Sequence, residues 1–201
     1  PAALYLAAAG VGRITLSDED VVSLSNLQRQ VLYATADVGR AKTQAAAERL
    51  EGLNPHVTTR AAPAVTGANA AEIVAGHDLV LDGTDNFETR LLVSDACLAA
   101  GVPLVTGAIG RWTGQVGVFA GKPCYRCLVP EVPPDAETCV AVGVVGALAG
   151  VIGSMMALEA VKLLAGAGQP LAGRLLIYDG LAGESRTVKV GADPACPACG
   201  G

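Results

Sequence analysis

Strand-length apolar runs alternate with helix-length segments through the first half of this chain of 201 residues. The periodicity and the Gly and Pro punctuation predict helices at 1–9, 40–53, 68–75 and 86–100, and strands at 13–16, 57–61, 78–82 and 103–106. Strands that alternate with helices in this way form parallel sheets with helices on both faces. We therefore expect an α/β fold built on a doubly wound, mostly parallel, Rossmann-like sheet.

The second half of the chain departs from this alternation. Residues 115–120, 175–178 and 187–190 are typical of strands in an antiparallel C-terminal extension, and a long helix is expected between them at 140–164. The sequence holds no internal repeat, no low-complexity linker and no domain boundary better than a loop. A single domain over residues 1–201 is therefore expected.

Composition narrows the class of protein. Hydrophobic residues make up 51% of the chain and charged residues 16%, which excludes disorder. The net charge is −5 and there is no run of Lys or Arg, so nucleic-acid binding is not expected. Six cysteines suit a reducing compartment, and the first ten residues do not have the pattern of a signal peptide. We expect a cytoplasmic protein.

The stretch at 140–158 has 19 residues without a charge and carries Gly146 and Gly150 at GxxxG spacing. That length is enough to span a bilayer. No basic cluster flanks the stretch, however, and Glu159 and Lys162 continue the same helical pattern. A helix buried in an α/β core, or at a dimer interface, has the same composition. We expect no membrane association and keep the membrane span as the alternative.

Two CxxC pairs, at Cys124 and Cys127 and at Cys196 and Cys199, form the strongest chemical motif. Four thiolates are the complement for a tetrahedral structural Zn²⁺. The metal would join two turns that lie far apart in the sequence and would restrict the unfolded chain. A thioredoxin-like redox role is the alternative, but that motif normally opens a helix after a strand, whereas Cys199 lies two residues from the end of the sequence. The cysteines therefore predict a Cys₄ zinc corner.

Acidic residues follow the first predicted strand. The run at 13–16 leads into three carboxylates at 18–20, and a polar block with amide side chains and Arg29 follows at 25–30. Carboxylates at the carboxyl end of a parallel strand are well placed to accept hydrogen bonds from ribose hydroxyls. A nearby arginine can neutralise phosphate oxygens. This arrangement predicts a nucleotide site, although a surface or salt-bridged arginine is the simpler interpretation of Arg29 taken alone.

Two further charged positions point to the same chemistry. Asp82 and Asp85 follow the predicted strand at 78–82, where a carboxylate can hold Mg²⁺ against substrate phosphates. The simpler interpretation makes Asp85 the N-cap of the next helix. Lys42 begins another predicted helix, where its charge would add to an anion site, although lysines at such positions are usually solvated.

Cys139 precedes the long apolar helix, and two roles are open for it. A thiol at a helix N-terminus can ionise readily and act as a nucleophile. Cysteine is also a small core residue, which is the expected fate of Cys97. His56 and His77 have no spaced partners, so no histidine-based triad or metal site is predicted.

Together, these motifs resemble the ThiF/MoeB/ubiquitin-activating family of adenylating enzymes. The resemblance is carried by the acidic run at 18–20, SNLQRQ at 25–30, Lys42, TDN at 84–86 and the two CxxC pairs. It extends from the first predicted helix to the last CxxC, over essentially the whole chain. The MoeB type, which activates the sulfur carrier of molybdopterin synthase, is the most similar, and the activator of thiamine synthesis comes second.

The resemblance implies an enzyme that uses ATP and Mg²⁺ to adenylate the C-terminal glycine of a small ubiquitin-like sulfur carrier ending in Gly-Gly. It assigns the ribose to Asp18, the phosphates to Arg29 and Lys42, and Mg²⁺ to Asp85. The nucleotide site that it implies comprises Asp18, Asp20, Asn26, Arg29, Gln30, Lys42, Asp85 and Asn86, and the catalytic residues are Arg29, Lys42, Asp85 and Cys139. Cys139 matches a cysteine that forms covalent intermediates in some relatives. The family also implies a homodimer.

One departure from the family pattern concerns the glycine-rich phosphate loop. The family's first strand and its GxGxxG loop would stand before Pro1, and Gly10 and Gly12 follow the first predicted helix, where they cannot replace that loop. We expect a fragment of a longer enzyme. A non-catalytic subunit that docks the carrier without using ATP is the alternative. An NAD-dependent oxidoreductase is a weaker one, because the chain has no Rossmann glycine fingerprint.

Overall fold

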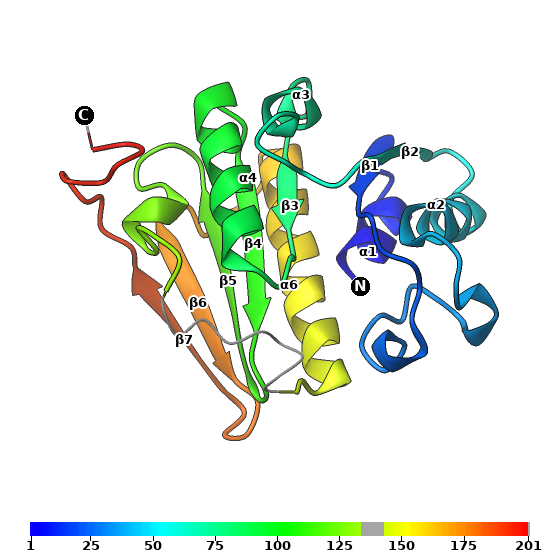
Figure 1. Ribbon diagram of the computed structural model, residues 1–201. Helices are drawn as coiled ribbons and strands as arrows, with labels where there is room; N and C mark the ends of the chain where they lie inside the picture. The colour runs from blue at the N-terminus through cyan, green and yellow to red at the C-terminus, as the bar shows by residue number, and fades with distance from the viewer. Residues whose placement is uncertain (134–142, 201) are drawn as a thin grey trace.

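The computed structural model describes residues 1–133 and 143–200 and places their strands in two sheets (Figure 1). One sheet is a parallel pair of β1 (Arg13–Ser17) and β2 (Thr58–Ala62). The other has the order β3-β4-β5-β6-β7 and consists of β3 (Val80–Asp82), β4 (Leu104–Ile109), β5 (Thr113–Phe119), β6 (Arg174–Asp179) and β7 (Glu184–Lys189). The expected α/β class is confirmed.

The five-stranded sheet contains both kinds of strand pairing. β3 and β4 are parallel, whereas β4–β5, β5–β6 and β6–β7 are antiparallel pairs, as expected for the C-terminal extension. Only residues 110–112 connect β4 to β5, which is too short for the crossover that a parallel pair needs. Among the described strands, parallel pairing is confined to β1–β2 and β3–β4, so the sheets are more antiparallel than the sequence predicts.

Helices cover both faces of the five-stranded sheet. The described α-helices are α1 (Ala2–Ala8), α2 (Lys42–Leu53), α3 (Ala70–Val74), α4 (Phe87–Ala100) and α6 (Gly146–Ala165), and 3-10 turns lie at Leu24–Asn26, Thr35–Asp37 and Tyr125–Cys127. In Figure 1, α4 and α6 lie on opposite sides of this sheet. Strand β4 shows why: Leu104 belongs to the buried apolar cluster that includes Leu91 of α4, whereas its neighbour Val105 belongs to the cluster that includes Ile152 of α6. Successive strand residues point to opposite faces, so an apolar strand needs a cover on each.

The helix expected at 140–164 corresponds to α6, but its expected start is wrong. Val145 has an extended backbone and caps the helix, which begins at Gly146, and residues 140–142 lie outside the described residues. Within the described part of the chain, α6 is the helix that is long and apolar enough to cross a membrane by length and composition. That is weak evidence, because a core helix meets the same criteria, and Ile152 and Met156 of α6 are buried against the sheet.

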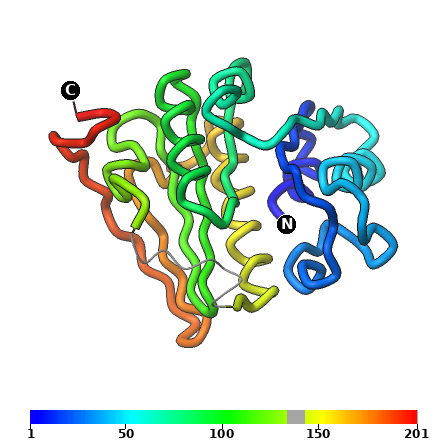
Figure 2. Tube along the Cα trace, in the orientation of Figure 1, coloured from blue at the N-terminus to red at the C-terminus, as the bar shows by residue number. Residues whose placement is uncertain are grey.

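Glycines allow α6 to approach the rest of the chain closely. A Cβ at Gly107 of β4 would overlap the sulfur of Met156 on α6. A Cβ at Gly146, the first residue of α6, would overlap the backbone carbonyl of Gln28. Figure 2 shows α6, in yellow, between the five-stranded sheet and the blue N-terminal segment, so these contacts join the two halves of the molecule.

The Gly146→Ala substitution is expected to destabilise the protein, because the new methyl group would meet backbone atoms of Gln28 rather than the movable end of a side chain. Overpacking of this kind costs about 1–3 kcal/mol. Gly150→Ala is the matched control, since Gly150 lies on the same helix and a Cβ there meets nothing within 4 Å. Alanine should instead favour the helix at that position, by up to about 1 kcal/mol. Thermal unfolding followed by circular dichroism checks the contrast, and equal Tm values for the two variants would contradict it.

Candidate functional site

Lys42, at the start of α2, is buried and bound to two carboxylates. The residue is only 5% exposed, and its Nζ lies 2.6 Å from Asp20 Oδ2 and 3.6 Å from Asp18 Oδ2. The interpretation of Lys42 as an ordinary solvated lysine is therefore wrong. Three residues of the expected nucleotide site lie together at the carboxyl end of β1, and both carboxylates stay accessible to solvent.

Backbone hydrogen bonds hold the acidic segment beside the start of α2. The amide of Lys42 donates to the carbonyl of Asp20 at 2.9 Å, and the amide of Val22 donates to the carbonyl of Arg40 at 2.8 Å. Gly39 donates to the carbonyl of Val22 and has a φ of +88°, a conformation that side chains disfavour. These hydrogen bonds fix the backbone of the acidic segment relative to the start of α2, and so hold Lys42 next to its two carboxylates.

The SNLQRQ block at 25–30 forms a tight turn with unsatisfied side chains. The carbonyl of Asn26 accepts from the amides of Arg29 and Gln30 at 3.0 and 2.9 Å. Arg29 makes one long hydrogen bond, from Nη1 to the carbonyl of Ser25 at 3.4 Å, and no ion pair with any described residue. Gln30 Oε1 is buried, and the described residues give it no hydrogen-bond partner. A guanidinium with a single long hydrogen bond and an unpartnered buried oxygen are groups that a polar, anionic ligand would satisfy.

Tyr33 borders the same turn, and the sequence analysis did not identify it. Burial, and then the negative charges of Asp18 and Asp37, raise the pKa of Tyr33 to about 12. The phenol therefore remains an uncharged hydrogen-bond donor throughout the neutral range. Its place three residues after Gln30 was the available signal, but a lone tyrosine is far more often a packing residue.

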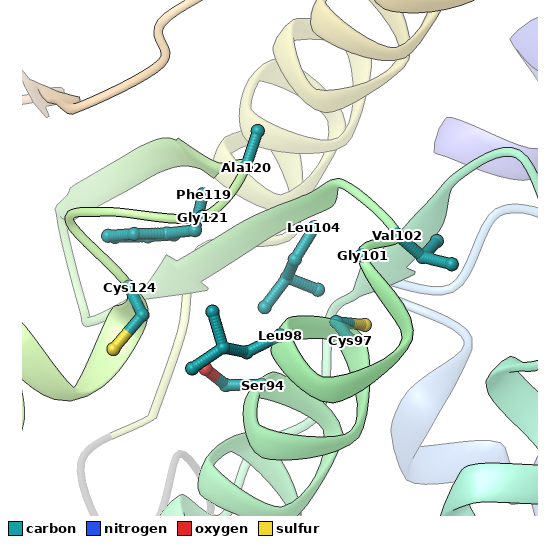
Figure 3. A pocket seen from close by; sticks show the side chains of 10 residues that line it. All are labelled: Ser94, Cys97, Leu98, Gly101, Val102, Leu104, Phe119, Ala120, Gly121 and Cys124. Carbon is teal, nitrogen blue, oxygen red and sulfur yellow. The ribbon is translucent and has the colours of Figure 1, made fainter. Parts of the chain in front are cut away.

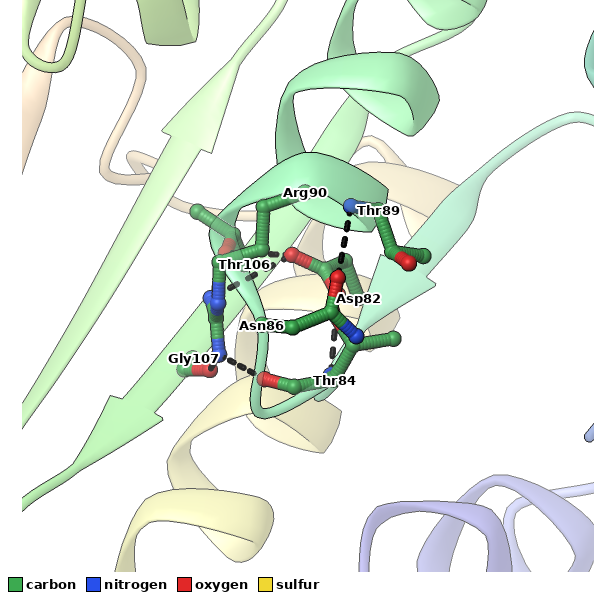
Figure 4. A network of polar contacts seen from close by, with 7 residues as sticks. All are labelled: Asp82, Thr84, Asn86, Thr89, Arg90, Thr106 and Gly107. Atoms are coloured by element: carbon green, nitrogen blue, oxygen red, sulfur yellow. Dashed lines mark hydrogen bonds and ion pairs between the residues drawn. The ribbon is translucent and has the colours of Figure 1, made fainter. Parts of the chain in front are cut away.

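Asp82, the last residue of β3, is buried and fully engaged (Figure 4). Its Oδ1 accepts from the amide and hydroxyl of Thr84 at 2.9 and 2.7 Å. Its Oδ2 accepts from Arg90 Nη1 at 3.2 Å and from the hydroxyl of Thr106 at 3.0 Å. With four hydrogen bonds on two oxygens, Asp82 has little capacity for a ligand and acts as the anchor of the loop that follows.

Asp85 lies in the loop after Asp82, and its environment differs from that of Asp82. It is exposed, and within the described ranges its carboxylate makes no ion pair. The interpretation of Asp85 as the cap of α4 is wrong: the N-cap is Asn86, whose Oδ1 accepts from the amide of Thr89 at 2.8 Å. The loop therefore leaves Asp85 free to bind a ligand, while Asn86 has its amide oxygen engaged in the helix.

The expected site residues thus fall into two groups. Asp18, Asp20 and Lys42 are in direct contact after β1, and Asp85 follows β3 in the other sheet. In Figure 1, the segment after β1 and the N-terminal end of α4 both lie toward the lower side of the molecule. The remaining expected catalytic residue, Cys139, lies outside the described residues.

The two CxxC pairs meet in space as expected. Cys124 Sγ lies 3.6 Å from Cys196 Sγ, and Cys127 Sγ lies 3.4 Å from Cys199 Sγ. All four sulfurs are within 4.8 Å of one another. A tetrahedral Zn²⁺ with bonds of about 2.3 Å separates its sulfurs by about 3.8 Å, which agrees with these distances. The cluster is a candidate metal centre.

The pKa values within this cluster diverge. Burial, and then contacts with the thiols of Cys199 and Cys196, raise the pKa of Cys124 to about 12. Burial also opposes ionisation of Cys196, but the backbone N–H groups of Ala198 and Cys199 stabilise its thiolate, and its pKa falls to about 7. Each pair faces the other pair across the cluster, which favours a shared metal over separate redox motifs.

Cys97 is a core residue, as expected. It is only 2% exposed, and burial together with the charge of Asp82 raises its pKa to about 12, so it stays a neutral thiol. Cys97 lines a cavity of about 120 Å³ between α4 and the sheet (Figure 3). Cys124 lies at the other end of that cavity, and Leu98 and Leu104 line it between them.

Comparison with known proteins gives the family. The ThiF family model matches residues 1–198 of the chain. The sulfur carrier protein adenylyltransferase of Thermus thermophilus is 50% identical, over 100% of this chain and 78% of that protein. The molybdopterin-synthase adenylyltransferase of Escherichia coli is 47% identical, over 99% of this chain and 82% of that protein.

A solved structure agrees on the fold. The crystal structure of Escherichia coli MccB with ATP matches with a TM-score of 0.85 at 20% identity, over 100% of this chain and 63% of the MccB chain. This chain therefore spans less than two thirds of that protein. The family match over almost all residues and two relatives near half identity lead to one conclusion: the chain belongs to the ThiF family.

Proposed function

We propose that this chain transfers AMP from ATP to the C-terminal glycine carboxylate of a small ubiquitin-like sulfur carrier, of the molybdopterin or thiamine type. The observation that carries the proposal is the buried cation of Lys42, held by Asp18 and Asp20 at the carboxyl end of a parallel strand. Sites of this kind in α/β sheets bind nucleotides. The names of the two adenylyltransferases described above support the reaction and the class of substrate.

The reaction brings like charges together. The glycine carboxylate attacks the α-phosphorus of ATP, the bond from that phosphorus to the bridging oxygen breaks, and pyrophosphate leaves with the electron pair. Fixed cations must offset the repulsion between carboxylate and polyphosphate. The ammonium of Lys42 has three N–H donors. Asp20 accepts one of them at 2.6 Å, and Asp18 is an ion-pair partner at 3.6 Å, so N–H donors remain for a phosphate oxygen.

The turn at 25–30 supplies the remaining nucleotide contacts. Arg29, which has no carboxylate partner among the described residues, is suited to phosphate oxygens. The unpartnered oxygen of Gln30 is suited to a hydroxyl or amino group of the nucleotide. The side chain of Asp18 is 40% exposed, so a ribose hydroxyl is able to donate to it. Asn26, Asp20 and Asn86 complete the polar surroundings.

Asp85 is the residue that would hold Mg²⁺. Its carboxylate is exposed in the loop after β3, whereas both oxygens of Asp82 already accept hydrogen bonds. A Mg²⁺ bound there would neutralise part of the polyphosphate charge. Asp85 thereby contributes to the reaction through charge and position, and takes no proton from the substrate.

The Asp85→Asn substitution in the full-length protein is expected to reduce carrier-dependent ATP–pyrophosphate exchange by about 100-fold or more, a loss typical of removing one electrostatic group from an active site. The free energy of unfolding should change by less than about 0.5 kcal/mol, because Asp85 is exposed. Glu88→Gln is the control, since Glu88 is also an exposed carboxylate at the start of α4. Unchanged exchange in Asp85→Asn, with carrier binding that is indifferent to ATP, would favour the non-catalytic docking subunit.

We also propose that the four clustered cysteines hold a structural Zn²⁺. The donor set and the sulfur distances fit this metal. Zinc would tie the turn at Tyr125–Cys127 to the C-terminal residues and so stabilise the end of the chain after β7.

Protein purified without chelators is expected to contain one zinc per chain by mass spectrometry of the metals. Cys196→Ser should lose that zinc and lower Tm, because the cluster keeps three sulfurs and a buried site without its metal. Cys97→Ala is the control: it removes a buried thiol outside the cluster and should lower Tm while leaving the zinc content unchanged. A protein without zinc before any substitution would contradict the proposal.

A homodimer in the cytoplasm completes the proposed function. Tyr5 and Val31 are 58% and 59% exposed, and with Met155 they line an apolar hollow of about 630 Å³ beside α1 and α6. A second copy of the chain would remove such a surface from water. A reducing compartment would keep the cysteine cluster available to the metal. Sedimentation that gives a monomer at micromolar concentration would contradict the dimer.

A further inference from the structure

Arg90 makes the densest set of polar contacts on α4. The residue is 6% exposed and lies in the first turn of the helix. Its Nη1 donates to Asp82 Oδ2 at 3.2 Å and to the hydroxyl of Thr106 at 2.9 Å. Its Nη2 donates to the carbonyl of Gly107 at 2.8 Å and to the carbonyl of Thr84. One guanidinium thus joins the end of β3, the loop after it and strand β4 (Figure 4).

The loop held in this way is the one that carries Asp85. Thr84, directly before Asp85, is fixed at its amide and hydroxyl by Asp82 and at its carbonyl by Arg90. Asn86, directly after Asp85, is fixed as the cap of α4. Asp85 therefore stands between two tethered residues while its own side chain stays exposed. Arg90 is itself buried and contacts this loop through the carbonyl of Thr84.

A gain in stability does not by itself account for this arrangement. A buried ion pair loses its hydration, and well-packed apolar residues often stabilise a core equally well or better. The contacts also require an arginine: a planar fork with five N–H donors reaches acceptors on three chain segments, whereas a lysine offers one nitrogen.

We propose that Arg90 is a positioning residue that presets the loop at 83–86, so that Asp85 is held where Mg²⁺ and the nucleotide phosphates bind. This inference rests on the proposed function, because Mg²⁺ binding by Asp85 belongs to it. Asp82 and Thr106 complete the hydrogen-bonded network around Arg90. Asp82 provides the fixed charge, and the hydroxyl of Thr106 accepts from Arg90 while it donates to Asp82.

The test compares Arg90→Lys with Glu159→Gln. Glu159 is likewise 6% exposed and charged, but it lies on α6, where its Oε2 accepts from the amide of Leu171 at 2.8 Å. Backbone hydrogen exchange of the metal-free proteins is the first measurement. In Arg90→Lys the amide of Thr84, which donates to Asp82 at 2.9 Å, should exchange about 10-fold faster, and in Glu159→Gln it should be unchanged. Binding of Mn²⁺ with a non-hydrolysable ATP analogue, followed by electron paramagnetic resonance, is the second. Loss of a residue that supports a metal ligand should weaken it about 10- to 100-fold.

Equal exchange of the Thr84 amide and equal Mn²⁺ affinity in Arg90→Lys and Glu159→Gln would overturn the proposal. If Arg90→Lys does not fold, Thr106→Val replaces it, because this variant keeps Arg90 and removes one of its acceptors. Thr106→Val should speed amide exchange and weaken Mn²⁺ binding by smaller factors than Arg90→Lys. If neither quantity changes, the proposal is likewise overturned. Absence of Mn²⁺–nucleotide binding in the unaltered protein would refute the proposed function instead, while the amide exchange would still decide whether Arg90 orders the loop.

Discussion

The close approach of α6 to its neighbours is the constraint on which the rest of the structure depends. This helix packs on the face of the five-stranded sheet through Ile152 and Met156, and on α1 through its other side. Its first residue, Gly146, touches the backbone of the turn that contains Arg29 and Gln30. The turn at 25–30 and the sheet whose strand β3 leads to Asp85 are therefore both in contact with a single helix, and glycine at the contact points makes that possible.

The two parts of the candidate site, after β1 and after β3, arrange their charged side chains in the same way. After β1, a buried cation, Lys42, is held by carboxylates that remain exposed. After β3, a buried carboxylate, Asp82, is held by the buried Arg90, and the exposed Asp85 follows in the loop. In each half the buried group is fixed by partners on other segments, and an exposed carboxylate is left for a ligand. A site of this kind is arranged before the ligand arrives, which reduces the cost of binding.

The sequence predicted the local elements well and the long-range arrangement less well. Strands and most helices lie within two or three residues of their expected bounds, because periodicity and capping are local. The division into two sheets and the share of antiparallel pairs depend on contacts between distant segments. The convergence of Cys124 and Cys196 could be predicted, since four thiols imply a shared metal. Arg90 was missed because an arginine in a helix usually faces water, and only the tertiary fold shows that it lies beneath Asp82 and Thr106.

Lys42 is paired with two carboxylates, and this affects whether the proposed site would bind free ATP or its magnesium complex. Among the residues assigned to the proposed site and its acidic run, four carboxylates (Asp18, Glu19, Asp20 and Asp85) outnumber two cations (Arg29 and Lys42), so this set carries a net negative charge at neutral pH. Uncomplexed ATP, with its four negative charges, is repelled by such a surface, whereas the magnesium complex carries about half that charge. If these residues form the proposed nucleotide site, their net charge would favour the magnesium complex over free ATP, and substrate binding would follow the free magnesium concentration.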